Sequence, residues 1–163
     1  LMVFPSASCK MEVIKTGHFS GMISVCNLAR LDYGSLYLEL KHRNMALLGF
    51  SPLQGGILTD RYEHYCADNG DRRSGESFHK QYAKRQRIAE FFAEEIGPSM
   101  TSFAMRALLS TPVMGSLITG MSTVEQVDEV VTALAAPALP PDIFKRAVEL
   151  WHDELAFIDT TTT

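Results

Sequence analysis

The stretch that decides the fold spans residues 45–62 and reads Met45-Ala-Leu-Leu-Gly-Phe-Ser-Pro-Leu-Gln-Gly-Gly-Ile-Leu-Thr-Asp-Arg-Tyr62. Its first six residues form a short apolar run, which predicts a buried parallel strand. Pro52 ends this strand because proline has no N–H for a sheet ladder, and Gly55-Gly56 lets the backbone approach a ligand closely. Ligands bind at the carboxyl ends of strands in α/β folds. The stretch therefore indicates either a ligand loop or an ordinary polar loop.

Outward from this stretch, apolar runs alternate with segments of helical period. Strands are expected at residues 1–4, 22–26, 45–50 and 113–119. Helices are expected at residues 8–16, 36–43, 78–96, 99–109, 123–134 and 140–155, with Gly17 ending the first and Ser99 capping the fourth. Residues 63–77 are polar and predict a long surface loop, and residues 160–163 predict a disordered tail. Strand and helix repeat four times, which predicts an α/β fold with parallel strands.

The predicted helix at 78–96 carries a basic cluster of Lys80, Lys84, Arg85 and Arg87. These side chains lie on other sides of the helix than its apolar side, which includes Ile88. Two interpretations fit this pattern: the cluster is a solvated helix face, or it contacts a phosphate group.

A capping box is predicted after the last strand. Ser122-Thr123-Val124-Glu125 places Ser122 at the N-cap and Glu125 at the N3 position. A capped helix that follows a buried strand can bind an anion, because its N–H groups and dipole point at the ligand. The same box can serve only to start the helix. The apolar positions expected to face inward are Val124, Val127, Val131 and Leu134.

Length and composition limit the class of protein. The 163 residues suit one domain with a hydrophobic core, whereas a complete (β/α)8 barrel needs about 250 residues. The net charge of −4 gives no reason to expect nucleic acid or an anionic membrane as a partner. No run reaches the ~18 apolar residues of a membrane span. Three cysteines without a CxxC pair indicate reduced thiols, so we expect a cytoplasmic protein.

Several segments resemble the aldo-keto reductases. Residues 50–62 resemble the family segment aromatic-[Ser/Asn]-Pro-Leu-x-Gly-Gly-Leu-Leu-Thr-Gly-Lys-Tyr, and residues 120–127 resemble Gly-[Ala/Met]-Ser-Ser-x-Glu-Gln-Leu. Residues 98–106 and 139–151 are similar to the aflatoxin-aldehyde and succinic-semialdehyde reductase branch. The resemblance covers residues 1–155 and implies an NADP(H)-dependent oxidoreductase that reduces aldehydes and ketones. It implies the C-terminal half of a (β/α)8 TIM barrel, strands five to eight, as a domain over residues 1–159.

The resemblance also assigns NADP(H)-binding residues. Phe50 takes the place of the aromatic residue that stacks on nicotinamide; the alternative is a plain core residue. The diphosphate is expected along Ser51, Leu53, Gln54 and Gly55, with Arg61 in place of the family's lysine. The 2′-phosphate and adenosine are expected at Gly120, Met121, Ser122, Gln126 and Glu129.

The sequence departs from the family where nicotinamide binds. Phe4-Pro5 replaces a serine–asparagine pair, Ile23 replaces a glutamine, and Val130 replaces an asparagine near the adenine. The family's catalytic Asp, Tyr, Lys and His come from the first half of the barrel, which this chain does not match. No catalytic residue and no metal ligand is therefore assigned.

Two functions remain open. One is a carbonyl reductase represented by its C-terminal half, acting on a small carbonyl substrate once an N-terminal half completes it. The other is an inactive half-barrel that binds nucleotide weakly or binds a partner, with association through exposed strand edges expected.

Overall fold

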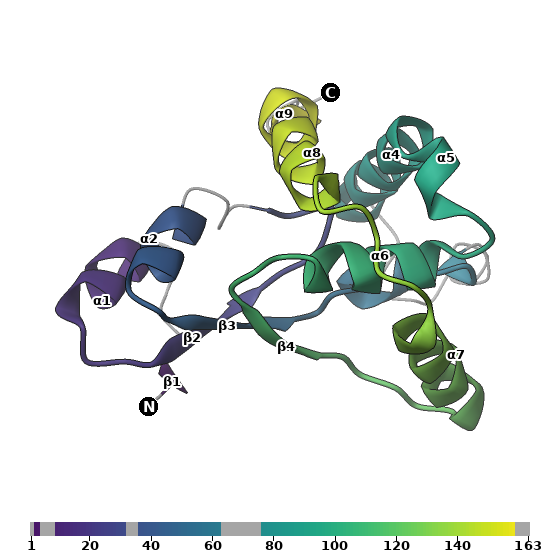
Figure 1. Cartoon of the computed structure of the whole chain (residues 1–163). Coiled ribbons are helices and arrows are strands. Elements are labelled where there is room, and N and C mark those ends of the chain that lie inside the picture. The colour runs from purple at the N-terminus through teal and green to yellow at the C-terminus, as the bar shows by residue number, and fades with distance from the viewer. Residues whose placement is uncertain (1, 4–8, 32–35, 63–75, 159–163) are drawn as a thin grey trace.

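A computed structural model describes residues 2–3, 9–31, 36–62 and 76–158 (Figure 1). It contains a four-stranded sheet in the order β1-β2-β3-β4. The strands are β1 (Met2–Val3), β2 (Gly21–Val25), β3 (Ala46–Phe50) and β4 (Met114–Ile118). Every neighbouring pair is parallel, and order in space equals order in sequence. The predicted α/β fold with parallel strands is confirmed.

Helical segments connect and follow the strands. They are α1 (Lys10–Thr16), α2 (Tyr37–His42), the short turn η3 (Gln54–Gly56), α4 (Glu76–Phe91), α5 (Ala93–Ile96), α6 (Met100–Leu109), α7 (Val124–Ala135), α8 (Ile143–Leu150), the π-helical turn η4 (Trp151–Leu155) and α9 (Ala156–Ile158). As predicted, Gly17 ends α1 in the left-handed region, and the Ser99 side chain caps α6 by accepting from the Ser102 N–H. The expected helix at 78–96 is two helices, because Phe92 leaves helical geometry.

Some predictions lie outside the described residues. These are residues 63–75 of the loop expected at 63–77, the tail at 160–163, the Phe4-Pro5 pair and the first part of the helix expected at 8–16. The last two residues of the expected loop, Glu76 and Ser77, are described and belong to α4 instead. Within the described part of the chain, no helix has both the length and the apolar character to cross a membrane.

The helices gather on one face of the sheet. In Figure 1, α1, α2, α6 and α8 lie above the strands, α7 lies beside the segment that follows β4, and none of the described helices lies against the lower face of the sheet. Side chains alternate accordingly: Met22 and Leu47 are fully buried, whereas their neighbours Ile23 and Leu48 are half-buried. Parallel sheets in complete α/β domains are covered on both faces, so the described part of the chain leaves one sheet face open.

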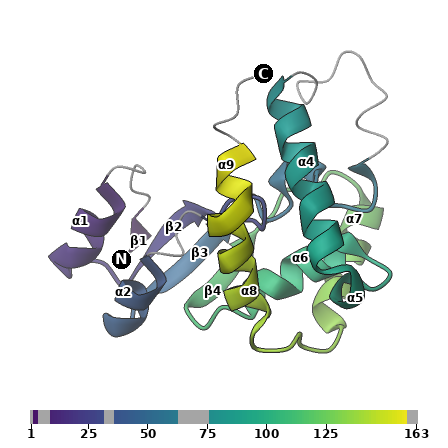
Figure 2. The ribbon, with the colours of Figure 1, turned by 90° about the horizontal axis from the view of Figure 1, so that it is seen from above.

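Two segments distant in sequence lie side by side on the covered face. Figure 2 shows α4 next to the α8–α9 segment. They are joined by an ion pair in which Arg87 Nη2 donates to Glu154 Oε1 at 2.9 Å. This hydrogen bond holds the pKa of Glu154 below its ordinary value.

The basic cluster of α4 does not form a solvated face. Lys84 is buried, and its Nζ donates to the Ala29 carbonyl at 3.3 Å. Arg85 donates to backbone carbonyls of the loop after β3, and Arg87 pairs with Glu154. Long basic side chains can bury their stems while the polar heads find partners, which helical periodicity does not reveal. The solvated-face interpretation is wrong for these three residues.

The inward direction predicted for α7 is also wrong. Val124 is 70% exposed and Val131 is 59% exposed, and Val127 and Leu134 are exposed as well. The side of α7 that packs against α6 instead carries Val130 and Ala133. An apolar stripe identifies the face of a helix that needs cover, and here that stripe points away from the described part of the chain.

Gly49 leaves room for side chains of the neighbouring strands to pack over β3. A Cβ atom built at this position would lie 2.9 Å from Leu117 Cδ2 and 3.0 Å from Cys26 Cβ. Leu117 is on β4, and Cys26 directly follows β2. The packing of the Leu117 and Cys26 side chains over β3 therefore depends on a residue without a side chain at position 49.

We expect Gly49→Ala to lower the free energy of unfolding by about 1–3 kcal/mol, the usual cost of overpacking a core. Urea unfolding followed by circular dichroism measures this change. Gly120→Ala is the control, because a Cβ there meets no atom within 4 Å. An equal loss in both variants, or none at Gly49, would contradict the close approach.

Candidate functional site

A cavity of about 490 Å³ lies where β3 and β4 end. Its lining comes from the loop after β3, the turn after β4, α6 and α7. Most residues predicted to bind a nucleotide line it: Ser51, Leu53, Gly55, Arg61, Gly120, Met121, Ser122, Gln126 and Glu129. Gly56, expected from the sequence to let the backbone approach a ligand, lines it too. Sequence reasoning missed Thr59, Thr101 and Thr119, and it considered Val130 only as a lost hydrogen bond. The two segments predicted to form a site thus meet in one cavity.

Phe50 and Gln54 are the predicted residues that do not line this cavity. Phe50 is the last residue of β3, is half-buried, and pairs in register with Val25. Gln54 turns its side chain away from the cavity, toward Asn27 and Gln81.

The loop after β3 begins with left-handed backbone. Ser51, Gln54 and Gly55 have φ angles of 59°, 47° and 63°. For a residue other than glycine this region costs about 1–2 kcal/mol, so other contacts must hold it. Buried Asn27 does so: its Nδ2 donates to the Ser51 carbonyl at 3.3 Å and to Gln54 Oε1 at 2.6 Å. Gln54 Nε2 in turn donates to Gln81 Oε1 at 3.2 Å.

Sequence reasoning gave no role to Asn27. Its place directly after a strand, where polar side chains reach the ligand edge of a parallel sheet, is the pattern that could have found it.

Arg85 of α4 anchors the middle of the loop. Its Nε donates to the Ile57 carbonyl at 2.8 Å, and its Nη2 donates to the Thr59 carbonyl at 3.3 Å. Its guanidinium carbon lies 3.5 Å from the centroid of the Tyr62 ring, a cation–π contact. Tyr62 also packs against Tyr82, with ring centroids 5.4 Å apart. Arg85 therefore fixes the loop backbone rather than lining the cavity.

Asp60 anchors the end of the loop to the start of α6. Its Oδ1 accepts from the Met100 N–H at 2.7 Å, and its Oδ2 accepts from the Ser99 hydroxyl at 2.6 Å. The backbone N–H of Asp60 donates to Thr101 Oγ1 at 3.3 Å. A carboxylate at a helix N-terminus satisfies N–H groups and complements the helix dipole. Sequence reasoning assigned Asp60 no role.

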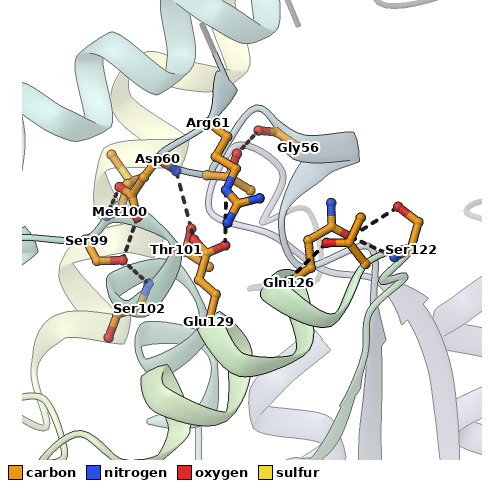
Figure 3. A network of polar contacts seen from close by, with 12 residues as sticks. Gly56, Asp60, Arg61, Ser99, Met100, Thr101, Ser102, Ser122, Gln126 and Glu129 are labelled. Carbon is orange, nitrogen blue, oxygen red and sulfur yellow. Dashed lines mark hydrogen bonds and ion pairs between the residues drawn. The ribbon is translucent and has the colours of Figure 1, made fainter. Parts of the chain in front are cut away.

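Polar contacts at the rim of the cavity link the loop after β3, α6 and α7 (Figure 3). Thr101 Oγ1 donates to Glu129 Oε1 at 2.5 Å. Glu129 Oε2 lies 4.0 Å from Arg61 Nε. Because the Arg61 side chain is 45% exposed, this attraction contributes only about 0–1 kcal/mol to stability.

The start of α7 differs from the predicted capping box by one residue. Thr123, not Ser122, is the N-cap: its backbone is extended and its hydroxyl accepts from the Gln126 N–H at 3.3 Å. Gln126 Oε1 reaches back and accepts from the Ser122 N–H at 2.7 Å and from the Ser122 hydroxyl at 3.2 Å. Gln126, not Glu125, is thus the side chain that reaches back to the helix start, and Glu125 is exposed. The pKa of Glu125 lies below its ordinary value. The main cause is a hydrogen bond from its own backbone N–H, and the next is a hydrogen bond with the Thr123 side chain.

The remaining predicted departures concern apolar side chains. Val130 lines the cavity and offers no hydrogen bond there. Ile23 lies on β2 and is half-buried. In the ranges that the structure describes, no group of three or more His, Cys, Asp or Glu side chains could hold a metal ion.

Four parallel strands with a cavity at their carboxyl ends define this chain as the C-terminal half of a (β/α)8 barrel. Residues 20–152 match the profile of the Aldo/keto reductase family, and the chain belongs to that family.

Individual relatives are consistent with this assignment. Human Aldo-keto reductase family 7 member A3 and human Aflatoxin B1 aldehyde reductase member 4 are each 28% identical to it over 139 residues, covering 72% of this chain and 42% of the relative. The chain therefore spans less than half the length of these curated relatives.

Solved structures share the fold. The glycerol dehydrogenase of Gluconobacter oxydans superimposes with a TM-score of 0.65 at 20% identity, over 100% of this chain and 52% of that one. The holo form of an aldo-keto reductase from Bacillus halodurans gives a TM-score of 0.64 at 13% identity, over 86% of this chain and 45% of that one.

We expect Thr123→Ala to destabilise the chain by about 1 kcal/mol, because the N-cap hydrogen bond to Gln126 is lost. Ser122→Ala is the matched control and should cost less, since its backbone N–H keeps the bond to Gln126. Thermal unfolding of both variants measures the difference. A larger loss from the Ser122 change would restore Ser122 as the cap.

Proposed function

We propose that this chain is the nucleotide-binding half of an NADP(H)-dependent reductase that converts aldehydes or ketones to alcohols. One observation carries the proposal: residues from two segments that resemble the family, 50–62 and 120–127, line a single cavity together with Glu129. Family membership supports the reaction class, and the names of the relatives, an aldehyde reductase and a glycerol dehydrogenase, support a carbonyl–alcohol substrate pair.

The residues of the cavity suit a dinucleotide. Gly55 is left-handed and a Cβ there would meet no atom within 4 Å, so the loop presents open backbone to a diphosphate. Arg61 supplies a cation, and Ser122 and Gln126 supply a hydroxyl and an amide to the lining. When bound, NADPH supplies the hydride. The part of this chain is to bind and orient it.

We expect the chain to bind NADPH more tightly than NADH. Arg61 would contribute to both affinities through the diphosphate, and the turn at Ser122 would favour the cofactor that carries a 2′-phosphate. Isothermal titration calorimetry with both cofactors measures the ratio, and Arg61→Met should weaken both. Equal affinities, or no binding of either, would refute the cofactor assignment.

A second candidate function is binding of a partner, and we propose a second copy of this chain as that partner. A groove of about 510 Å³ runs beside β4, lined by Gly115, Ser116, Leu117, Ile118, Met121 and Leu134 among others. The exposed stripe of α7 adjoins it through Leu134. Within the described residues β1 and β4 are the sheet edges, and two copies joined edge to edge would bring together eight parallel strands.

We expect Val131→Asp to shift the chain from dimer to monomer, because a carboxylate in an apolar interface must be desolvated. Multi-angle light scattering measures the mass of each variant. Leu38→Asp is the control, since Leu38 is 73% exposed on α2, away from the α7 stripe. A wild-type chain that stays monomeric at high concentration would exclude the second copy.

A further inference from the structure

The cavity has a balanced charge. Among the described residues that line it, the charged ones are Arg61 and Glu129, which carry opposite signs. Their side chains face each other at 4.0 Å. A ligand phosphate that approaches Arg61 therefore also approaches a carboxylate.

Glu129 is positioned by a buried hydroxyl. Thr101 is fully buried, and its Oγ1 already accepts from the Asp60 N–H, so its hydroxyl proton is directed to Glu129 Oε1 at 2.5 Å. This bond leaves Oε2 turned toward Arg61 (Figure 3). The carboxylate is thus held at the rim by a chain of contacts that starts at the α6 terminus, rather than by Arg61 alone.

We infer that Glu129 is a specificity-determining residue that competes with ligand phosphate for Arg61. The inference rests on the proposed nucleotide function of this cavity. Binding of a phosphate group near Arg61 exchanges one anionic partner for another and leaves the Glu129 carboxylate close to the incoming charge. Glu129 therefore lowers the affinity for phosphorylated ligands relative to their unphosphorylated counterparts.

Neutralising Glu129 has a different effect on ligand affinity in this role than it would have if Glu129 were only an adenosine contact. If Glu129 acted only by accepting a hydrogen bond from adenosine, its neutralisation would weaken phosphorylated and unphosphorylated ligands alike. If the Glu129 carboxylate instead opposes a ligand phosphate, its neutralisation changes the affinity for the phosphorylated ligand alone. The ratio of the two affinities therefore separates the roles.

The test measures the affinities of adenosine 2′,5′-bisphosphate and adenosine for wild type and Glu129→Gln. Glutamine keeps an oxygen that can accept from Thr101 and removes only the charge. We expect the affinity ratio, bisphosphate over adenosine, to rise about fivefold, the upper range for a partly exposed ion pair. Melting temperatures of both proteins establish that each is folded.

Two further variants serve as controls. Asp128→Asn removes the same charge from the neighbouring position on α7, where the side chain is exposed and outside the cavity lining, and should change the ratio little. In the double variant Arg61→Met with Glu129→Gln, the rise in the ratio should disappear. An unchanged or lower ratio in Glu129→Gln, or an equal rise in Asp128→Asn, would overturn the inference while leaving the proposed function intact. Failure of every variant to bind the bisphosphate would overturn both.

Discussion

The left-handed backbone after β3 is the constraint on which the site depends. Ser51 and Gln54 are not glycines, so their conformation persists only because the surrounding structure holds it. Asn27 supplies that hold at the start of the loop, Arg85 in the middle, and Asp60 at the end. With these contacts the loop crosses the strand ends and reaches α6, and the cavity lies between it and α7.

Much of this arrangement could be predicted because its patterns are local. Short apolar runs that end in turn residues gave the strands, and the Pro52 and Gly55 positions marked the loop after the central strand. The anchors could not be predicted in the same way. Asn27 and Arg85 act on loop residues 24 to 28 positions away, and such a contact leaves no periodic trace in the sequence.

The errors at α7 have two separate physical causes. The run Ser122-Thr-Val-Glu-Gln126 contains the capping-box pattern in two overlapping frames, and only the extended backbone of Thr123 selects the second frame. The exposed valines have a different cause. Periodicity located the apolar stripe correctly, but the direction in which a stripe points depends on what surrounds the helix. Here α6 receives the opposite side, which carries Val130 and Ala133.

The contact between Asp60 and the start of α6 makes one amide a reporter on the loop. The Met100 N–H lies in the first turn of its helix, where no intrahelical carbonyl can accept it, and its partner is the Asp60 carboxylate. Its exchange with solvent deuterium is therefore governed by release of the loop rather than by fraying of α6. Amides deeper in α6, such as that of Phe103, bond within the helix and exchange independently of the loop. Comparing the two rates gives the free energy of loop opening without any ligand.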